Sequence, residues 1–241
     1  MSELQSVEAA LAALMKDVSP VEAETLPCEQ AGRRVLAEEV IARLDVPPFD
    51  NSAMDGYALH HEDAGKRLPI VQRIAAGSEP RPLSRGTCAR IFTGAPLPPG
   101  ADCVVMQEKV EVVDDAADIP LQVPADNNVR HRGSDVAAGA VLLEAGQRLD
   151  AAALGHLASQ GVVEVSVRRR PRVALLNSGD EIVEPGQPLA AGQIYNSNRP
   201  MLKDQLQRFG AEVSFIASMP DDAEGTRAML ALAAEQADVV V

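Results

Sequence analysis

The 241-residue chain carries 22 lysine and arginine residues against 35 aspartate and glutamate residues, a formal net charge of −13 at pH 7. This charge repels nucleic-acid backbones and anionic membranes, so we expect neither as a partner. Hydrophobic residues make up 46% of the chain, which predicts globular domains. The sequence contains no run of about 20 apolar residues, so it predicts no membrane span. The start does not resemble a secretory signal and the three cysteines have no metal-ligand spacing, so we expect a cytoplasmic protein.

The N-terminal part of the sequence predicts one helix and then a β-rich region. Apolar residues recur at steps of three and four over residues 2–17, which is typical of an amphipathic helix. From residue 43 to about residue 135, short β-rich runs alternate with glycine and proline. These runs are LPIVQRIAAG, CARIFTG, CVVMQEKVEVV and IPLQV.

A second helix follows the β-rich region, from Asp150 to Gly161, and the strand VVEVSV comes after it. Helical segments therefore flank the β-rich region on both sides. We predict an elongated helical domain made of residues 1–45 and 136–168, with an inserted β-rich domain at residues 46–135.

Residues 169–241 predict alternating strands and helices. RVALL, AEVSFIA and ADVVV are the expected strands. They are separated by a helix near 198–209 that buries Leu202, Leu206 and Phe209, and by an alanine-rich helix capped by Asp221 or Asp222. This order predicts a doubly wound parallel sheet, so the expected fold class is multidomain, α+β and α/β. Because ligands bind beyond the carboxyl ends of such strands and the sequence stops on one, we expect an incomplete domain from a longer chain.

The stretch VPPFDNSAMDGYAL, residues 46–59, is the first candidate for a functional loop. Its paired prolines hold the backbone extended, and Asp55-Gly56 is a strong turn signal. We expect the stretch to present Asp50, Asn51, Ser52 and Asp55 together rather than to form a core element.

The loop NSGDEI, residues 177–182, follows the first strand of the predicted sheet, where a doubly wound fold places its ligand. Its small residues let the backbone approach a ligand, and Asp180 with Glu181 offers hard oxygen ligands suited to Mg²⁺. A solvated acidic turn is the alternative. The later stretch IYNSNRP predicts a helix N-terminus, which is either an anion site or an ordinary cap.

The stretch VRHRGSD, residues 129–135, combines basic side chains with a turn. Arg130 is suited to phosphate oxygens, and Gly133 allows a turn that aims Asp135 inward. A basic surface loop is the alternative. The four histidines of the sequence assemble into no recognisable metal site or catalytic triad.

Together, VPPFDNSAMDGYAL, IFTGAPLPPGADCVVMQE, VRHRGSDV and LNSGDEIVEPGQPLAAGQIYNSN resemble the MoeA-type molybdopterin molybdenumtransferases, which are related to the E domain of gephyrin. The resemblance covers essentially the whole chain, although members of the family continue beyond the position where this sequence ends. It implies insertion of molybdate into adenylylated molybdopterin with release of AMP, the last step of molybdenum cofactor biosynthesis, with a requirement for Mg²⁺.

The resemblance also implies a homodimer with an active site between subunits, and contact with other molybdenum cofactor enzymes. By motif, Asp55, Asp180 and Glu181 would be catalytic, and the last two would hold the metal. The substrate-binding residues implied by motif are Thr93, Arg130, Asp135, Ser178, Gly179 and Asp221. Alternatives are a molybdopterin adenylyltransferase and a non-catalytic gephyrin-like scaffold. We expect the 241 residues alone to bind ligand weakly and not to turn over.

Overall fold

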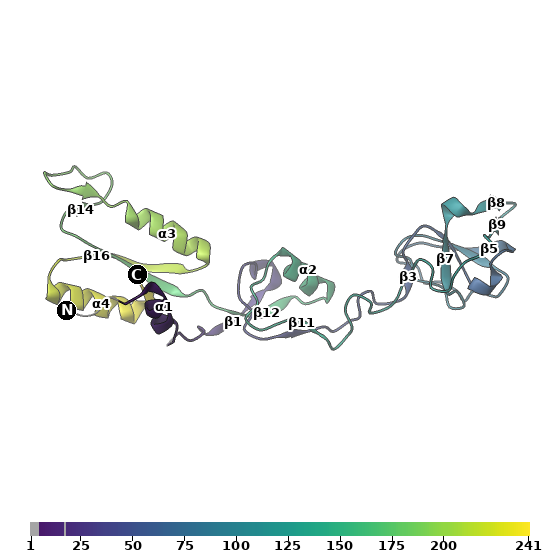
Figure 1. Cartoon of the computed structure of the whole chain (residues 1–241), viewed down its shortest axis with the longest axis horizontal. Helices are drawn as coiled ribbons and strands as arrows, with labels where there is room; N and C mark the ends of the chain where they lie inside the picture. The colour runs from purple at the N-terminus through teal and green to yellow at the C-terminus, as the bar shows by residue number, and fades with distance from the viewer. Residues whose placement is uncertain (1–4, 17) are drawn as a thin grey trace. The chain divides into compact units, whose positions relative to one another are not determined.

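The computed structural model describes residues 5–16 and 18–241 (Figure 1). The chain forms two compact units, one made of Glu39–Leu143 and the other of Met1–Glu38 with Glu144–Val241. The division into three domains, at 1–45 with 136–168, 46–135 and 169–241, stays a prediction. Within the described residues, none of the helices combines the length and apolar composition that a bilayer crossing requires.

The unit of Glu39–Leu143 contains a six-stranded sheet with the strand order β7-β4-β6-β5-β9-β8. β5 and β6 run parallel, and the other neighbouring pairs are antiparallel. The strands are β4 (Gly56–Leu59), β5 (Arg67–Ile74), β6 (Cys88–Ile91), β7 (Cys103–Met106), β8 (Glu111–Val113) and β9 (Ala116–Asp118). The run IPLQV is therefore not a strand, since β9 ends before it.

Strand β4 lies between β6 and β7 and is buried on both faces. Its side chains alternate, as the two-residue period of a strand requires: Tyr57 and Leu59 join one buried apolar cluster, and Ala58 joins another. The expectation that residues 46–59 form no core element is wrong for the second half of this stretch. Asn51 and Ser52 are also buried, so they are not presented with Asp55.

Two short antiparallel pairs accompany this sheet. β3 (Asn51–Ser52) pairs with β10 (Val129–Arg130), and β2 (Val40–Ile41) pairs with β11 (Val141–Leu143). The two pairs bring the two ends of the β-rich segment side by side, which an insertion into another domain requires.

In the other unit, β1 (Ala23–Pro27) pairs with β12 (Glu164–Arg168), so residues from before and after the β unit form one antiparallel ribbon. Helix α2 (Ala151–Ser159) begins as the sequence predicts, because the Asp150 carboxylate accepts a hydrogen bond from the amide of Ala153 at 2.8 Å. The amphipathic pattern near the start forms α1 (Val7–Lys16).

The C-terminal part of this unit is a three-stranded parallel sheet with the order β16-β13-β17, which confirms the three predicted strands. The strands are β13 (Arg172–Ser178), β16 (Glu212–Met219) and β17 (Val239–Val240). Figure 1 shows α3 (Asn198–Phe209) on one side of these strands and α4 (Ala223–Gln236) on the other. Gly210 ends α3 with φ of 98°, but Phe209 is 73% exposed, so its predicted burial is wrong.

Salt bridges to Asp238 hold the first and last strands of this sheet in register. Its carboxylate accepts from the guanidinium groups of Arg169 and Arg172 and from the Arg172 amide. The Arg169 contact is the main cause that lowers the pKa of Asp238. Arg169 also pairs with Glu22, so one guanidinium links three distant parts of the sequence.

We predict that Gly56→Ala destabilises the β unit by about 3 kcal/mol, because a Cβ atom at this position would lie 2.0 Å from the carbonyl oxygen of Val105 in β7. Urea unfolding followed by circular dichroism measures the effect. Gly155→Ala is the control: Gly155 lies in α2 with open space around it, and alanine there should stabilise the helix by about 0.5–1 kcal/mol. Equal transition midpoints for wild type and Gly56→Ala would contradict the close packing.

Candidate functional site

The first candidate group lies in the β unit, where the turn before β4 meets the loop after β6. The Asp55 carboxylate accepts hydrogen bonds at Oδ1 from the amide of Thr93 at 2.8 Å and from its hydroxyl at 2.7 Å. No residue in the described parts of the chain donates to the other carboxylate oxygen of Asp55. The structure thus joins Asp55 and Thr93, which lie 38 positions apart, and leaves one oxygen for a ligand.

These contacts hold Asp55 ionised. The amide of Thr93, then its hydroxyl and to a lesser extent the charge of Arg90 lower the pKa of the Asp55 carboxyl. Arg90 lies over the rings of Tyr57 and Phe92, at 5.2 and 4.7 Å from their centroids, and donates to the carbonyl of Gly56 at 2.9 Å. The guanidinium group therefore links the buried strand to the carboxylate turn.

The second candidate group lies at the carboxyl ends of β13 and β16. Ser178 is the last residue of β13 and is paired with Met219 of β16. Next to it, the amide of Asp180 donates to the Asp221 carboxylate at 3.3 Å, so the two acidic loops lie together. In a parallel sheet this edge is where ligands bind.

Gly179 lets the acidic loop turn tightly. Its φ is 130°, and a Cβ atom there would lie 2.7 Å from the Glu181 carboxylate and 2.8 Å from the Ile182 side chain. The backbone carbonyl of Glu181 accepts from the amide of Ile194 at 2.9 Å, which anchors the loop to β15 (Ile194–Tyr195), itself paired with β14 (Ile182–Val183). Gly179, which the sequence predicts to face a ligand, is therefore also needed for the loop to adopt its backbone conformation.

Arg199, at the start of α3, lies in the centre of a polar network beside this loop. Its guanidinium group donates to Asn177 at 3.3 Å and to Ser218 at 2.9 Å, and pairs with Glu184 at 2.8 Å. Asn196 accepts from the Arg199 amide at 3.0 Å and caps the helix. Asn196 therefore acts as an ordinary helix cap, as one of the two interpretations of IYNSNRP predicts. The network around Arg199 joins residues from several segments, so no single sequence motif predicts it.

Arg130 and Asp135 are not brought into contact with Asp55 or Thr93 by any described hydrogen bond. Arg130 lies in β10 opposite Asn51, and its side chain is exposed. Asp135 is also exposed, with its amide bonded to the carbonyl of Val46 at 2.9 Å. Both residues border the 46–59 stretch through the backbone, so their roles toward a ligand stay predictions.

The donors available for a metal ion differ between the two units. Asp180 and Glu181 offer carboxylate oxygens, but among the described residues they form no close group of three ligand atoms. The residues that do form one are His60, His61 and Asp102, all in the β unit. Two of the four histidines therefore lie in a group that could hold a metal ion, which no spacing in the sequence indicates.

The chain matches two protein families. Residues 174–241, which contain the acidic loop and most of the parallel sheet, match the family described as "Probable molybdopterin binding domain". The parallel-sheet part of the chain is thus similar to domains of the molybdopterin-binding class. Residues 5–161 match the family described as "MoeA N-terminal region (domain I and II)". This chain belongs to the MoeA family.

Individual relatives agree with this assignment. The chain is 40% identical over 231 residues to a molybdopterin molybdenumtransferase of Synechococcus elongatus, covering 91% of this chain and 57% of that protein. A molybdopterin molybdenumtransferase of Haemophilus influenzae is 39% identical, with 92% and 56% covered. The crystal structure of a MoeA protein of molybdopterin biosynthesis from Pyrococcus horikoshii superimposes with a TM-score of 0.90 at 30% identity, covering 99% of this chain and 66% of that one. The chain thus spans less than two thirds of these relatives.

We predict that Thr93→Val raises the pKa of Asp55, because valine keeps the amide donor but removes the hydroxyl. The folded-state pKa is below the unfolded value, so this carboxylate stabilises the fold above pH ~4 and loses that effect as the pH falls through its folded pKa. Carboxyl carbon NMR titration measures the change. Thr87→Val is the control, since its hydroxyl donates to the carbonyl of Ser84. An unchanged Asp55 pKa would refute the role of the Thr93 hydroxyl.

Proposed function

We propose that this chain contributes to the insertion of molybdate into adenylylated molybdopterin, with release of AMP, as the last step of molybdenum cofactor biosynthesis. The main support for the proposal is that the chain matches two family models and that each matched region contains a carboxylate loop held by hydrogen bonds, at Asp55 and at Asp180. The names of the relatives support the reaction, and the match over residues 5–161 favours it over a molybdopterin adenylyltransferase. In this proposal the three parallel strands belong to a doubly wound domain, and the reaction takes place in the cytoplasm.

In this proposal the acidic loop binds the phosphate end of the substrate through Mg²⁺. Mg²⁺ in proteins is bound through one or two carboxylates, together with substrate phosphates and water, and Asp180 with Glu181 supplies such donors. The two residues fit the ion because both belong to an exposed loop at the ligand-binding edge of the sheet. When bound, Mg²⁺ supplies Lewis acidity to the phosphate bridge.

The remaining residues position the substrate. Ser178 and Gly179 contact the ligand through the backbone at the end of β13, and Asp221 holds the amide of Asp180. Asp55, fixed by Thr93, accepts a hydrogen bond from the pterin nucleotide through its open oxygen. Arg130 offsets the charge of the phosphate, and Asp135 contributes to the substrate site from the β unit. Orientation of molybdate and substrate does most of the work, and no protein nucleophile is required.

We further propose a homodimer in which the β unit of one subunit faces the sheet of the other. Asp55 and Glu181 then serve one site from different chains. We also propose contact with other molybdenum cofactor enzymes. The alternative is a non-catalytic, gephyrin-like scaffold that binds partners but carries out no reaction.

Glu181→Gln should lower Mg²⁺-dependent AMP release by roughly 10²-fold, because it removes a charged donor to the phosphate-bound ion. AMP release is measured with adenylylated molybdopterin and molybdate in a longer protein that contains this chain, and ligand binding is measured in parallel on the 241-residue chain. Glu235→Gln, an exposed change near the far end of α4, is the matched control and should leave both unchanged. Undiminished AMP release by Glu181→Gln would overturn the metal assignment.

Co-expression of Asp55→Asn with Glu181→Gln, in a longer protein that contains this chain, tests the shared site. If the two residues come from different subunits, half of the dimers carry one intact site, and activity returns to roughly a quarter of wild type. If both residues act within one subunit, the mixture stays as inactive as each variant alone.

A further inference from the structure

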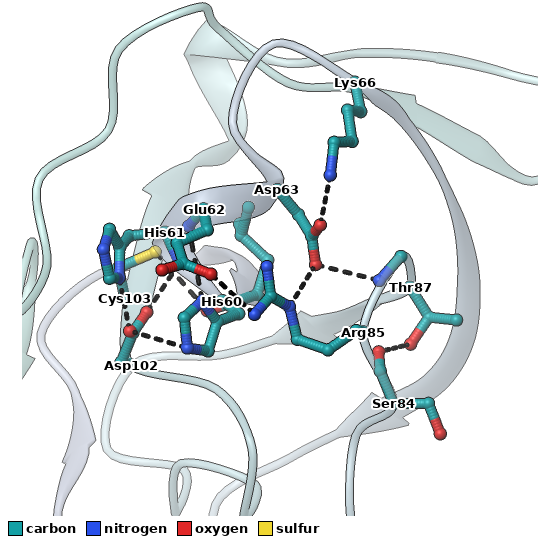
Figure 2. A network of polar contacts seen from close by, with 12 residues as sticks. His60, His61, Glu62, Asp63, Lys66, Ser84, Arg85, Thr87, Asp102 and Cys103 are labelled. Atoms are coloured by element: carbon teal, nitrogen blue, oxygen red, sulfur yellow. Dashed lines mark hydrogen bonds and ion pairs between the residues drawn. The ribbon is translucent and has the colours of Figure 1, made fainter.

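Three metal-ligating side chains meet on the β unit, away from the carboxylate turn at Asp55. His60 is the residue directly after β4, and His61 begins the short 3-10 helix His61–Asp63. Asp102 lies directly before β7. Figure 2 shows both imidazole rings beside the Asp102 carboxylate. One ligand atom from each of the three residues lies within 4.8 Å of the others.

The distances are close to those of a coordination site. His60 Nε2 lies 3.5 Å from Asp102 Oδ2, and His61 Nδ1 lies 2.5 Å from the same oxygen. A tetrahedral zinc ion about 2.0–2.2 Å from its ligands keeps them about 3.3–3.6 Å apart. The His60–Asp102 pair already has this spacing, and the His61–Asp102 pair needs to open by about 1 Å.

The backbone around the three side chains is already anchored. Asp102 Oδ1 accepts from the His61 amide at 2.7 Å, and the Asp102 amide donates to the carbonyl of Leu59 in β4 at 3.1 Å. The two rings stack with centroids 4.9 Å apart and an interplanar angle of 23°. Because the His61 amide holds the Asp102 carboxylate and stacking orients the two rings, less ordering is needed when an ion binds.

The neighbouring acidic residues are already neutralised. Asp63, 2% exposed, accepts from Lys66 at 2.6 Å, Arg85 at 3.1 Å and the Gly86 amide at 2.8 Å (Figure 2). Glu62 pairs with Arg85 at 2.8 Å. These contacts rigidify the turn that carries the histidines and leave Asp102 as the carboxylate that faces both rings.

The fourth ligand is not a thiol. Cys103 follows Asp102, but it is fully buried and its thiol donates to the carbonyl of Leu59 in β4 at 3.4 Å, so its sulfur is committed to the core of the β unit. The side chains of His60, His61 and Asp102 are 27%, 37% and 29% exposed, so water reaches the open position. Coordination through His60 Nε2 gives up the 3.3 Å contact from the Glu62 amide to His60 Nδ1, and coordination through His61 Nδ1 gives up its 2.5 Å hydrogen bond to Asp102 Oδ2.

We propose that His60, His61 and Asp102 form a binding site for a divalent transition-metal ion, with Zn²⁺ as the preferred ion and water as its fourth ligand. Two imidazoles and one carboxylate match the ligand preference of Zn²⁺, whereas Mg²⁺ prefers an all-oxygen site. This site is separate from the acidic loop proposed to hold Mg²⁺, so either assignment can fail without the other.

Calorimetric titration of the untagged protein with Zn²⁺ tests the site. We expect one ion bound per chain, and at least about tenfold weaker binding in His60→Ala, His61→Ala and Asp102→Asn. His131→Ala is the control, because His131 lies in the same unit, 3.5 Å from both Asp50 and Asp126, but with no second imidazole. Unchanged binding in all three variants, or equal weakening in His131→Ala, would overturn the proposal.

A second measurement on the wild-type protein does not depend on variants that fold. Titration with Co²⁺ should produce the intense visible absorption of a four-coordinate ion, and one equivalent of Zn²⁺ should remove it. Mg²⁺ at the same concentration should leave the Co²⁺ spectrum unchanged. A weak spectrum of six-coordinate Co²⁺, or no saturation at one equivalent, would refute the site.

Discussion

The close approach of two backbones at Gly56 underlies much of the β unit. Strand β4 fits between β6 and β7 only because no side chain separates Gly56 from the carbonyl of Val105. This contact places Tyr57 in a buried cluster, and it holds the turn before it against the loop that carries Thr93. The same strand continues into His60 and His61. One glycine therefore supports both the carboxylate turn and the histidine group.

The two proposed halves of the substrate site are built differently. In the β unit, Asp55 is fixed by direct hydrogen bonds from Thr93 and is held ionised by them. At the sheet, Asp180 and Glu181 belong to an exposed loop that is ordered mainly through its backbone. A rigid carboxylate suits recognition of a neutral ring system, whereas a loop with freer carboxylates suits an ion whose remaining ligands come from a substrate.

Local patterns predict the parallel sheet well, because its strands contain short apolar runs, VALL in β13 and FIA in β16, and because α3 ends at Gly210 and α4 begins at the Asp222 cap. They fail where long-range contacts decide. β4 has four residues after a proline-rich stretch, and only its position between two strands makes it a core element. His61 and Asp102 are 41 positions apart, so no spacing in the sequence brings them together. The Asp55–Thr93 contact is likewise set by the sheet, although the turn signal at Asp55-Gly56 marks one end of it.

The polar network around Arg199 has a consequence for how the binding of a cation and the binding of an anion at the sheet depend on each other. Its guanidinium group is already shared among Asn177, Glu184 and Ser218. A phosphate ligand approaching this edge therefore meets Asp180, Glu181 and Asp221 without an uncommitted arginine from the network to balance them. Favourable occupancy then requires cation and anion to bind with positive thermodynamic coupling, so the free concentration of the cation sets the apparent affinity for the anion.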